Sequence, residues 1–248
     1  MKECVLNFRN IDFYYEEDSS KKSHVIDFIA DKFSKNRKKI KRKQFVLQSL
    51  DFSVSAGEIV GILGGNGAGK STVLKLASGI LFPTKGEIHY SKVIAPIIEL
   101  GTGFSPDFSA RENILLYGCL LGNRRQIVRN AIPSIASWAG IEDVLDQSMR
   151  TFSTGMVSKT AFSTATHFPA NLVLIDEVLS VGDVNFRKKS ELRMKQILNS
   201  GAGVLFVSHD LDAVRNLTHR ALVLHQGQII FDGDPTLAVE KYLRATSE

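Results

Sequence analysis

The stretch that decides the fold is Gly64-Gly65-Asn66-Gly67-Ala68-Gly69-Lys70-Ser71, a run of glycines that ends in a lysine and a serine. It matches the phosphate-loop pattern, in which a glycine is followed after four residues by Gly-Lys-Ser or Gly-Lys-Thr. An apolar run, Glu58 to Leu63, precedes it, and a helix from Lys70 to Ser78 is expected after it, with Gly79 where that helix stops. The order strand, loop, helix is the context that a phosphate loop requires.

The residue types in this loop suit a nucleoside triphosphate. Glycines let backbone N–H groups turn inward around phosphate oxygens, and the helix N-terminus adds a favourable dipole. Lys70 can reach the β- and γ-phosphates, and the Ser71 hydroxyl can ligate magnesium. A glycine-rich turn with an adventitious lysine is the competing interpretation, and the complete motif in its context argues against it. The predicted nucleotide-binding residues are Gly64, Gly65, Asn66, Gly67, Ala68, Gly69, Lys70, Ser71 and Thr72.

A second cluster of polar residues follows two apolar runs further along the chain. Leu172 to Ile175 reads as a buried strand and leads into Asp176-Glu177. A carboxylate at the carboxyl end of a parallel strand lies beside the phosphate loop, so we expect Asp176 to help hold magnesium. Glu177, one residue further, is then placed to polarise a water that attacks the γ-phosphate. His209 follows the next strand; a lone histidine is more often a surface residue, but this position makes it a candidate site residue.

The remaining pattern predicts an α/β fold with a mostly parallel core sheet. Strands and helices alternate after residue 172, and the region from Ser109 to Ala165 contains helical stretches and no convincing strand. Within it, Pro133 is expected to break or kink a helix. The other predicted elements are a hairpin of Cys4 to Phe8 with Phe45 to Val54, a strand at Glu87 to Tyr90, helices at Arg111–Leu121, Arg125–Ala139, Val184–Asn199 and Leu211–Leu217, a strand at Val204–Val207, and a late hairpin at Leu222–Phe231.

Composition places the chain among ordinary soluble proteins. Its 248 residues are 44% hydrophobic and 23% charged, which excludes a disordered or fibrous protein. No apolar run of about 18 residues is present to span a bilayer, and the N-terminus lacks the apolar stretch and cleavage site of a secretory signal. Two distant cysteines, Cys4 and Cys119, suggest neither a disulfide framework nor a metal site. We therefore expect a cytosolic protein.

The formal net charge of +5 comes from one segment. Between Asp31 and Gln44 the chain carries Lys32, Lys35, Arg37, Lys38, Lys39, Lys41, Arg42 and Lys43, and without these the remainder is mildly acidic. Val25, Ile26, Ile29 and Phe33 precede them at helical spacing. Such a segment can be a solvated loop, a nucleic-acid contact, or a contact with anionic lipid headgroups, and the sequence leaves the three open.

Taken together, these motifs resemble those of the ATP-binding-cassette ATPases along almost the whole chain. Phe152-Ser153-Thr154-Gly155-Met156 stands where this family has its LSGGQ-type signature, and Ser180-Val181-Gly182-Asp183 resembles the loop ending in aspartate. His209 resembles the switch histidine, and Tyr15 matches the aromatic that stacks on adenine, with Tyr14 as the alternative. The resemblance implies a head-to-tail homodimer in which Ser153, Thr154, Gly155 and Met156 reach the nucleotide of the opposite subunit.

Two departures from the usual cassette pattern narrow the resemblance from the whole family to one subfamily. The signature reads Phe-Ser-Thr-Gly-Met, and Glu99 stands where a glutamine is usual. With Arg111-Glu112-Asn113-Ile114, these features resemble the ATPase subunits of bacterial exporters of O-antigen, capsule and teichoic acid. Thr154 and Lys159 stand where that subfamily would have a serine and an arginine. Glu99 is expected to contact magnesium or its bound water, or to relay the nucleotide state to a membrane partner; a solvated loop acid is the plainer alternative.

The resemblance implies one cassette domain over residues 1–248, with a basic insertion at 16–44, a helical lobe at 103–164 that holds the signature, and no additional C-terminal domain. The expected cofactors are ATP and Mg2+. The expected partners are a second copy of the chain and an integral membrane permease that handles a lipid-linked polysaccharide at the cytoplasmic face of the inner membrane, without nucleic acid. A non-transport cassette ATPase acting on nucleic acid or ribosomes, and a small-metabolite kinase, are the alternatives.

Overall fold

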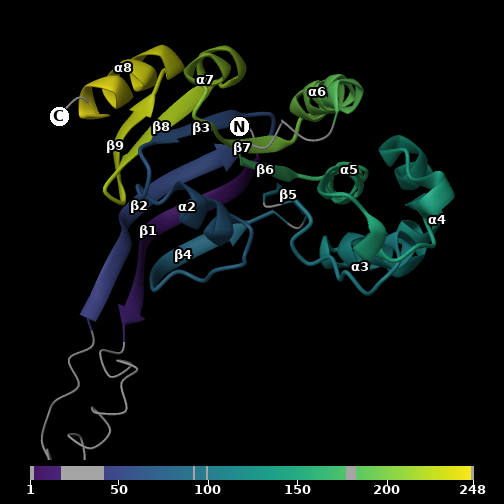
Figure 1. Ribbon diagram of the computed structural model, residues 1–248. Coiled ribbons are helices and arrows are strands. Elements are labelled where there is room, and N and C mark those ends of the chain that lie inside the picture. The colour runs from purple at the N-terminus through teal and green to yellow at the C-terminus, as the bar shows by residue number, and fades with distance from the viewer. Residues whose placement is uncertain (1–2, 18–41, 92, 99, 177–182, 247–248) are drawn as a thin grey trace, which may run out of the picture.

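The computed structural model describes residues 3–17, 42–91, 93–98, 100–176 and 183–246. Most of the predicted basic insertion, including its expected helix, lies outside these residues. The described chain forms two sheets and a group of helices that stands to one side of them (Figure 1).

The smaller sheet is antiparallel and has the strand order β2-β1-β4. Its strands are β1 (Cys4–Glu17), β2 (Arg42–Ser55) and β4 (Lys85–Tyr90). The predicted hairpin is confirmed and is longer than expected, since β1 pairs with β2 from Cys4↔Ser55 to Glu17↔Arg42. Its two arms extend beyond the body of the molecule (Figure 1).

The larger sheet has six strands in the order β5-β6-β7-β3-β8-β9. All neighbouring pairs are parallel except β8 and β9, which form the predicted late hairpin. The strands are β3 (Ile59–Gly64), β5 (Ile94–Ile97), β6 (Leu172–Asp176), β7 (Gly203–Val207), β8 (Arg220–His225) and β9 (Gln228–Gly233). The mostly parallel core sheet is confirmed.

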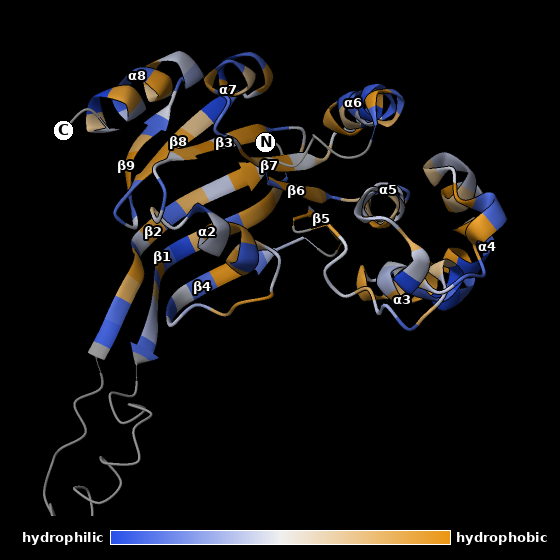
Figure 2. Cartoon of the chain, viewed as in Figure 1, coloured by the Kyte–Doolittle hydropathy of each residue, from blue (hydrophilic) through white to orange (hydrophobic). Residues whose placement is uncertain are grey.

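Both faces of this sheet are covered, which is why its central strands are apolar throughout. On one face lie α6 (Val184–Leu198), α7 (Leu211–Leu217) and α8 (Pro235–Thr246). On the other lie α2 (Lys70–Ala77) and the antiparallel sheet. Figure 2 shows the resulting concentration of hydrophobic residues along the inner strands.

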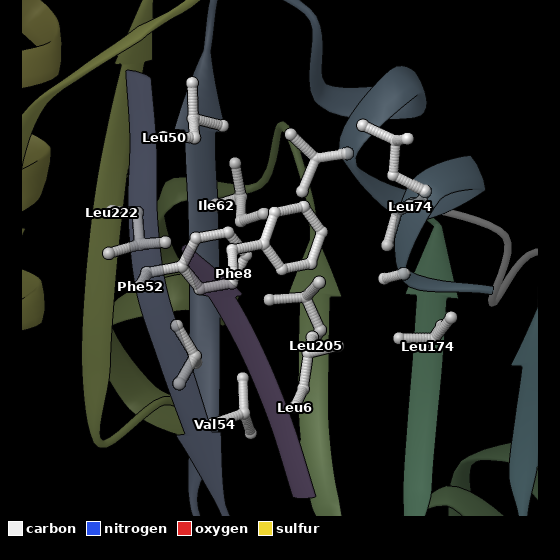
Figure 3. Packing of buried hydrophobic residues seen from close by; sticks show 14 of the residues in the cluster. Leu6, Phe8, Leu50, Phe52, Val54, Ile62, Leu74, Leu174, Leu205 and Leu222 are labelled. Carbon is white, nitrogen blue, oxygen red and sulfur yellow. The ribbon is translucent and has the colours of Figure 1, made fainter. Parts of the chain in front are cut away.

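The core between the two sheets is closely packed (Figure 3). Phe8 and Phe52 stack with ring centroids 4.5 Å apart, and Leu174 and Leu205 of the parallel sheet belong to the same cluster. A stacked aromatic pair contributes about 1 kcal/mol beyond the area that it buries. This core fixes the hairpin of β1 and β2 against the strand that leads into the phosphate loop.

The helical lobe is built from α3 (Ala110–Leu120), α4 (Arg125–Ala139) and α5 (Thr154–Ala165). Ser109 and Glu112 form a capping box that starts α3, and Gly140 ends α4 in the left-handed conformation. Ile114, Val128 and Ile135 belong to a separate core within this lobe. No described helix is both long and apolar enough to cross a membrane.

Two local features differ from the sequence interpretation. Strand β5 was not predicted because it is four residues long and contains Pro96, which is tolerated here since β5 is an edge strand. Of the break or kink expected at Pro133, the break is wrong, because α4 continues through that residue to Ala139. Pro133 is exposed and removes one backbone hydrogen bond, whereas Ile132 and Ile135 on either side of it are buried in the lobe core.

Candidate functional site

The glycine-rich loop joins the end of β3 to the start of α2, as the sequence predicts. Gly69 adopts φ +105° and caps α2, and a Cβ there would lie 2.6 Å from Leu47 Cδ2. A Cβ on Gly64 would lie 2.5 Å from the Leu224 carbonyl oxygen. Glycine is therefore required at both positions. At Gly64 the neighbouring strand leaves no room for a side chain, and at Gly69 the left-handed conformation favours glycine as well.

Lys70 is folded over the loop. Its side chain is only 8% exposed, and Nζ donates hydrogen bonds to the carbonyl oxygens of Gly64 at 2.7 Å and Gly65 at 3.0 Å. A buried ammonium surrounded by backbone groups is positioned to meet phosphate oxygens at this loop. Asn66, Gly67 and Ser71 are exposed, so the loop and the first turn of α2 are accessible to a ligand.

The parallel sheet aligns the other predicted residues with this loop. Asp176 is in register with Val207 of β7, and Val207 is in register with Ile62 of β3. His209 follows Val207 by two residues, and Gly64 follows Ile62 by two. Because parallel strands end at the same edge of a sheet, Asp176, His209 and the loop share one edge. Roles for Asp176 and His209 remain predictions.

The donor atoms near this edge fit magnesium. Ser71 supplies a hydroxyl and Asp176 a carboxylate, both hard oxygen ligands of the kind that Mg2+ prefers beside phosphates. Within the described residues, no group of three or more His, Cys, Asp or Glu side chains is suited to hold a metal by itself. The donor set therefore matches an ion that completes its shell with nucleotide oxygens and water. The predicted ligand Glu99 and the predicted base Glu177 lie outside the described residues.

The predicted signature begins α5 and is not next to the loop of its own chain. Ser153 is the N-cap of α5, and its Oγ accepts a hydrogen bond from the Met156 N–H at 3.2 Å. Ser153 and Thr154 are exposed, and a Cβ on Gly155 would meet little. Helix α5 packs against edge strand β5, and β5 is three positions from β3 in the sheet, about 14 Å at the usual strand spacing.

The two adjacent tyrosines of β1 lie on opposite faces of the hairpin. Tyr14 contacts Phe45 with centroids 5.1 Å apart, and the Lys43 ammonium lies 4.5 Å from its ring centre. Tyr15 contacts Phe13 edge-on at 5.0 Å, and Phe13 pairs with Leu47, the residue against Gly69. Tyr15 is 49% exposed. The face that carries Tyr15 is thus the face against which the loop packs.

The turn between β8 and β9 joins the hairpin to the loop. Gly227 N–H donates to the Ala68 carbonyl at 3.2 Å, and the Gly227 carbonyl accepts from Gln48 N–H at 2.9 Å. Gly227 has φ +78°, and its Cα approaches Val46 so closely that a Cβ has no room. These bonds hold β2 at a fixed position beside the phosphate loop.

An ion pair that the sequence did not predict joins the signature helix to α6. Lys159 Nζ lies 2.5 Å from Asp183 Oδ2, and Asp183 also caps α6 by accepting from the Phe186 N–H at 2.9 Å. The hydrogen bond from Lys159 is the main cause that lowers the pKa of Asp183 to about 2. Lys159 and Asp183 are 24 residues apart in the sequence. Their positions in two separate motifs were the only signal that the sequence offered for this pair.

A phosphate loop at the carboxyl end of a parallel strand, with an aspartate at the same end of another strand of that sheet, is the architecture of a phosphate-loop nucleotide-binding protein. The family model described as ABC transporter matches residues 47–180. The chain belongs to the ABC transporter family.

Several curated proteins are similar to this chain. The ABC transporter protein AbcA of Aeromonas salmonicida is 38% identical over 79% of this chain and 64% of its own length. The O-antigen export system ATP-binding protein RfbB of Klebsiella pneumoniae is 35% identical over 82% of this chain and 83% of its own length. The teichoic acids export ATP-binding protein TagH of Bacillus anthracis is 36% identical over 80% of this chain and 36% of its own length. The chain thus spans less than two thirds of some of these relatives.

Solved structures share the fold. The ATP-binding subunit of an ABC transporter aligns with a TM-score of 0.72 over 98% of this chain and 95% of its own, at 22% identity. A dimeric post-hydrolysis state of the ATP-binding cassette MJ0796, bound to ADP and Pi, aligns with a TM-score of 0.70 over 93% and 99% of the two chains, at 18% identity. The cassette fold predicted from the sequence is confirmed.

Proposed function

We propose that this chain is the ATP-hydrolysing subunit of an ABC exporter for a lipid-linked cell-surface polysaccharide. One observation carries the proposal: a complete phosphate loop with Lys70 folded over it lies in a chain that is 35% identical, over 83% of the relative, to an O-antigen export ATP-binding protein. The proposed partner is a membrane permease, and the chain then works at the cytoplasmic face of the cell membrane without nucleic acid. Residues 1–248 form one cassette, with the lobe at 103–164 inserted.

The nucleotide is held by the loop and the hairpin together. In this proposal the backbone N–H groups from Gly64 to Thr72 and the Lys70 ammonium bind the phosphates. Tyr15, not Tyr14, stacks on adenine, because Tyr15 lies on the loop face while Tyr14 is occupied by Phe45 and Lys43 on the other. Ser71 and Asp176 would hold Mg2+, which would neutralise charge on the phosphates, and Glu99 would supply a further carboxylate toward the ion or its water.

Hydrolysis needs a group that accepts a proton from the attacking water. We assign that role to Glu177, which follows Asp176 at the edge of the sheet. Water adds to the γ-phosphorus, the bond to the ADP oxygen breaks, and the proton of the water goes to the Glu177 carboxylate. His209, at the same edge, donates a hydrogen bond to the γ-phosphate.

The signature completes the site from a second copy. Ser153 and Thr154 are exposed at the start of α5, distant from the loop of their own chain. A head-to-tail homodimer brings Ser153, Gly155 and Met156 of one subunit to the phosphates held by the other. ATP then closes the dimer and hydrolysis opens it, and this movement drives the permease.

The test combines a binding assay, a phosphate-release assay and export. Glu177→Gln is expected to keep ATP binding, stop hydrolysis and accumulate an ATP-bound dimer in gel filtration, because an amide keeps the shape but cannot accept the proton. Lys70→Ala is expected to weaken ATP binding itself. In a strain lacking the native gene, neither variant should restore surface polysaccharide, and lipid-linked glycan should accumulate inside. Hydrolysis by Glu177→Gln at the parental rate would remove Glu177 from this role, and normal surface glycan without the gene would contradict the export function.

A further inference from the structure

The distal part of the hairpin carries a glutamine directly opposite Tyr15. In the β1–β2 register Phe13 pairs with Leu47, Tyr14 with Phe45, and Tyr15 with Gln44. Between the first two of these pairs β1 advances by one residue while β2 advances by two, so Val46 forms a bulge. Beyond this bulge the pairing continues regularly to Glu17↔Arg42.

The contacts on both faces show where Gln44 lies. Residues opposite each other on paired strands point to the same face, with Cβ atoms about 5 Å apart. On one face, Tyr14 contacts both Phe45 and Lys43. By alternation Tyr15 and Gln44 share the other face, and the contact of Tyr15 with Phe13 confirms it for the tyrosine. Gln44 is exposed, so its amide is available beside the exposed Tyr15 ring.

We propose that Gln44 reads the edge of the base that stacks on Tyr15 and selects adenine over guanine. This inference rests on the proposed nucleotide site. Adenine presents the N6–H donor beside the N7 acceptor, and a glutamine amide matches both, accepting with Oε1 and donating with Nε2. Guanine presents two acceptors, O6 and N7, at the same edge. There the amide makes one hydrogen bond, and its own oxygen faces an acceptor.

The position of Gln44 is set by the same contacts that place the loop. Leu47 lies three residues from Gln44 on β2 and packs against Gly69, and Gln48 is bonded to Gly227. From Phe13 to Tyr15 the chain advances about 6.6 Å along the strand. A base stacked on Tyr15 therefore lies along the hairpin from the loop, on the face that Gln44 shares with Tyr15.

The experiment compares dissociation constants for ATP and GTP in the purified full chain. The parent is expected to prefer ATP. Gln44→Ala is expected to reduce the ratio of GTP to ATP dissociation constants by about fivefold or more. Gln44→Arg supplies two donors that match O6 and N7 of guanine, and is expected to shift the preference toward GTP. Gln196→Ala, at an exposed glutamine of α6, is the matched control and should leave the ratio unchanged.

Two results would overturn the inference while leaving the proposed function intact. The first is that the parent binds ATP and GTP with equal affinity. The second is that both Gln44 variants keep the parental ratio of GTP to ATP dissociation constants, while Tyr15→Ala still weakens ATP binding. Failure of the parent to bind either nucleotide would overturn the inference and the proposed function together. The reversal in Gln44→Arg distinguishes base reading from a structural role, since a merely damaged hairpin would weaken both nucleotides alike.

Discussion

At the residue scale, the ion pair between Lys159 and Asp183 connects two motifs that the sequence presents separately. Lys159 is on the helix that starts at Ser153, and Asp183 closes the segment that follows Asp176. In the proposed mechanism the pair is a positioning contact between the helix that carries the predicted signature and Asp183, the N-cap of α6. It makes no contact with nucleotide in this proposal, so its effect should appear in turnover and not in affinity.

We expect Lys159→Met to lower kcat for ATP hydrolysis by about 10- to 100-fold with little change in ATP affinity, because small displacements of reacting groups are costly. Lys159→Arg should retain most activity. Steady-state phosphate release and equilibrium ATP binding measure the two effects. Asp183→Asn keeps a good N-cap for α6 and removes the charge, so combining it with Lys159→Met should add no further loss. Losses in kcat that multiply in the double variant would show that the two residues act independently.

The same pair predicts a pH dependence of stability. The pKa of Asp183 is about 2 in the folded chain, mainly because of the hydrogen bond from Lys159, against an ordinary value of 3.8. A lowered folded-state pKa adds stability above the ordinary pKa, and that stability is lost as pH falls toward 2. The difference in Tm between the parent and Lys159→Met should be present at pH 7 and should shrink between about pH 4 and pH 2. Circular dichroism melts measure it, and a constant difference across this range would contradict the assignment.

At the element scale, the packing of α3 on α4 depends on Gly118. A Cβ on Gly118 would lie 2.5 Å and 3.0 Å from the two methyl carbons of Val128. Gly118 and Val128 are both buried, so the Val128 side chain cannot move into solvent to make room for a methyl group at 118. The helical lobe thus tolerates no added methyl group at this crossing without displacement of a helix.

Gly118→Ala is expected to lower the free energy of unfolding by about 1–3 kcal/mol through overpacking. Val128→Ala alone should cost about 2 kcal/mol by leaving a cavity. The double variant should lose less than the sum of the two, since the alanine methyl at 118 enters the space left at 128. Urea denaturation of the three variants gives the comparison. Strictly additive losses would mean that the helices do not meet at this point.

At the scale of the whole molecule, one chain does not complete the proposed site. The loop follows β3 near the middle of the six-stranded sheet, and the signature helix packs at the β5 edge. A twofold head-to-tail dimer makes two equivalent composite sites, each with a loop from one subunit and Ser153 from the other.

Heterodimers of a Lys70→Ala chain with a Ser153→Arg chain test this arrangement. One composite site receives both changes, and the other combines an intact loop with an intact signature. We expect one occluded ATP per differently tagged heterodimer, with hydrolysis lower than half if the two sites are coupled. If loop and signature acted within one chain, both sites would be damaged. No occlusion in heterodimers whose two chains fold and associate would therefore contradict the shared site.

Much of the fold and the central motif could be predicted because they depend on residues close in sequence. The glycines from 64 to 69, the apolar run before them and the helix after them form a local unit, so strand, loop and helix were recognisable together. The apolar runs at 172–175 and 204–207 placed Asp176 and His209 at strand ends in the same way. Helix-compatible stretches and the lack of a convincing strand between Ser109 and Ala165 likewise indicated the lobe.

Only the tertiary structure decided features that depend on pairing between distant segments. Which of Tyr14 and Tyr15 lies on the loop face depended on the β1–β2 register and its bulge at Val46, because a shift of one residue reverses every side chain of a strand. Strand β5, too short and interrupted by Pro96, exists because β6 pairs with it. The Lys159–Asp183 pair spans 24 residues and forms because the lobe packs against α6. Periodicity reports which face of an element is apolar, whereas the neighbour of each face is fixed only when the sheets and helices close on a common core.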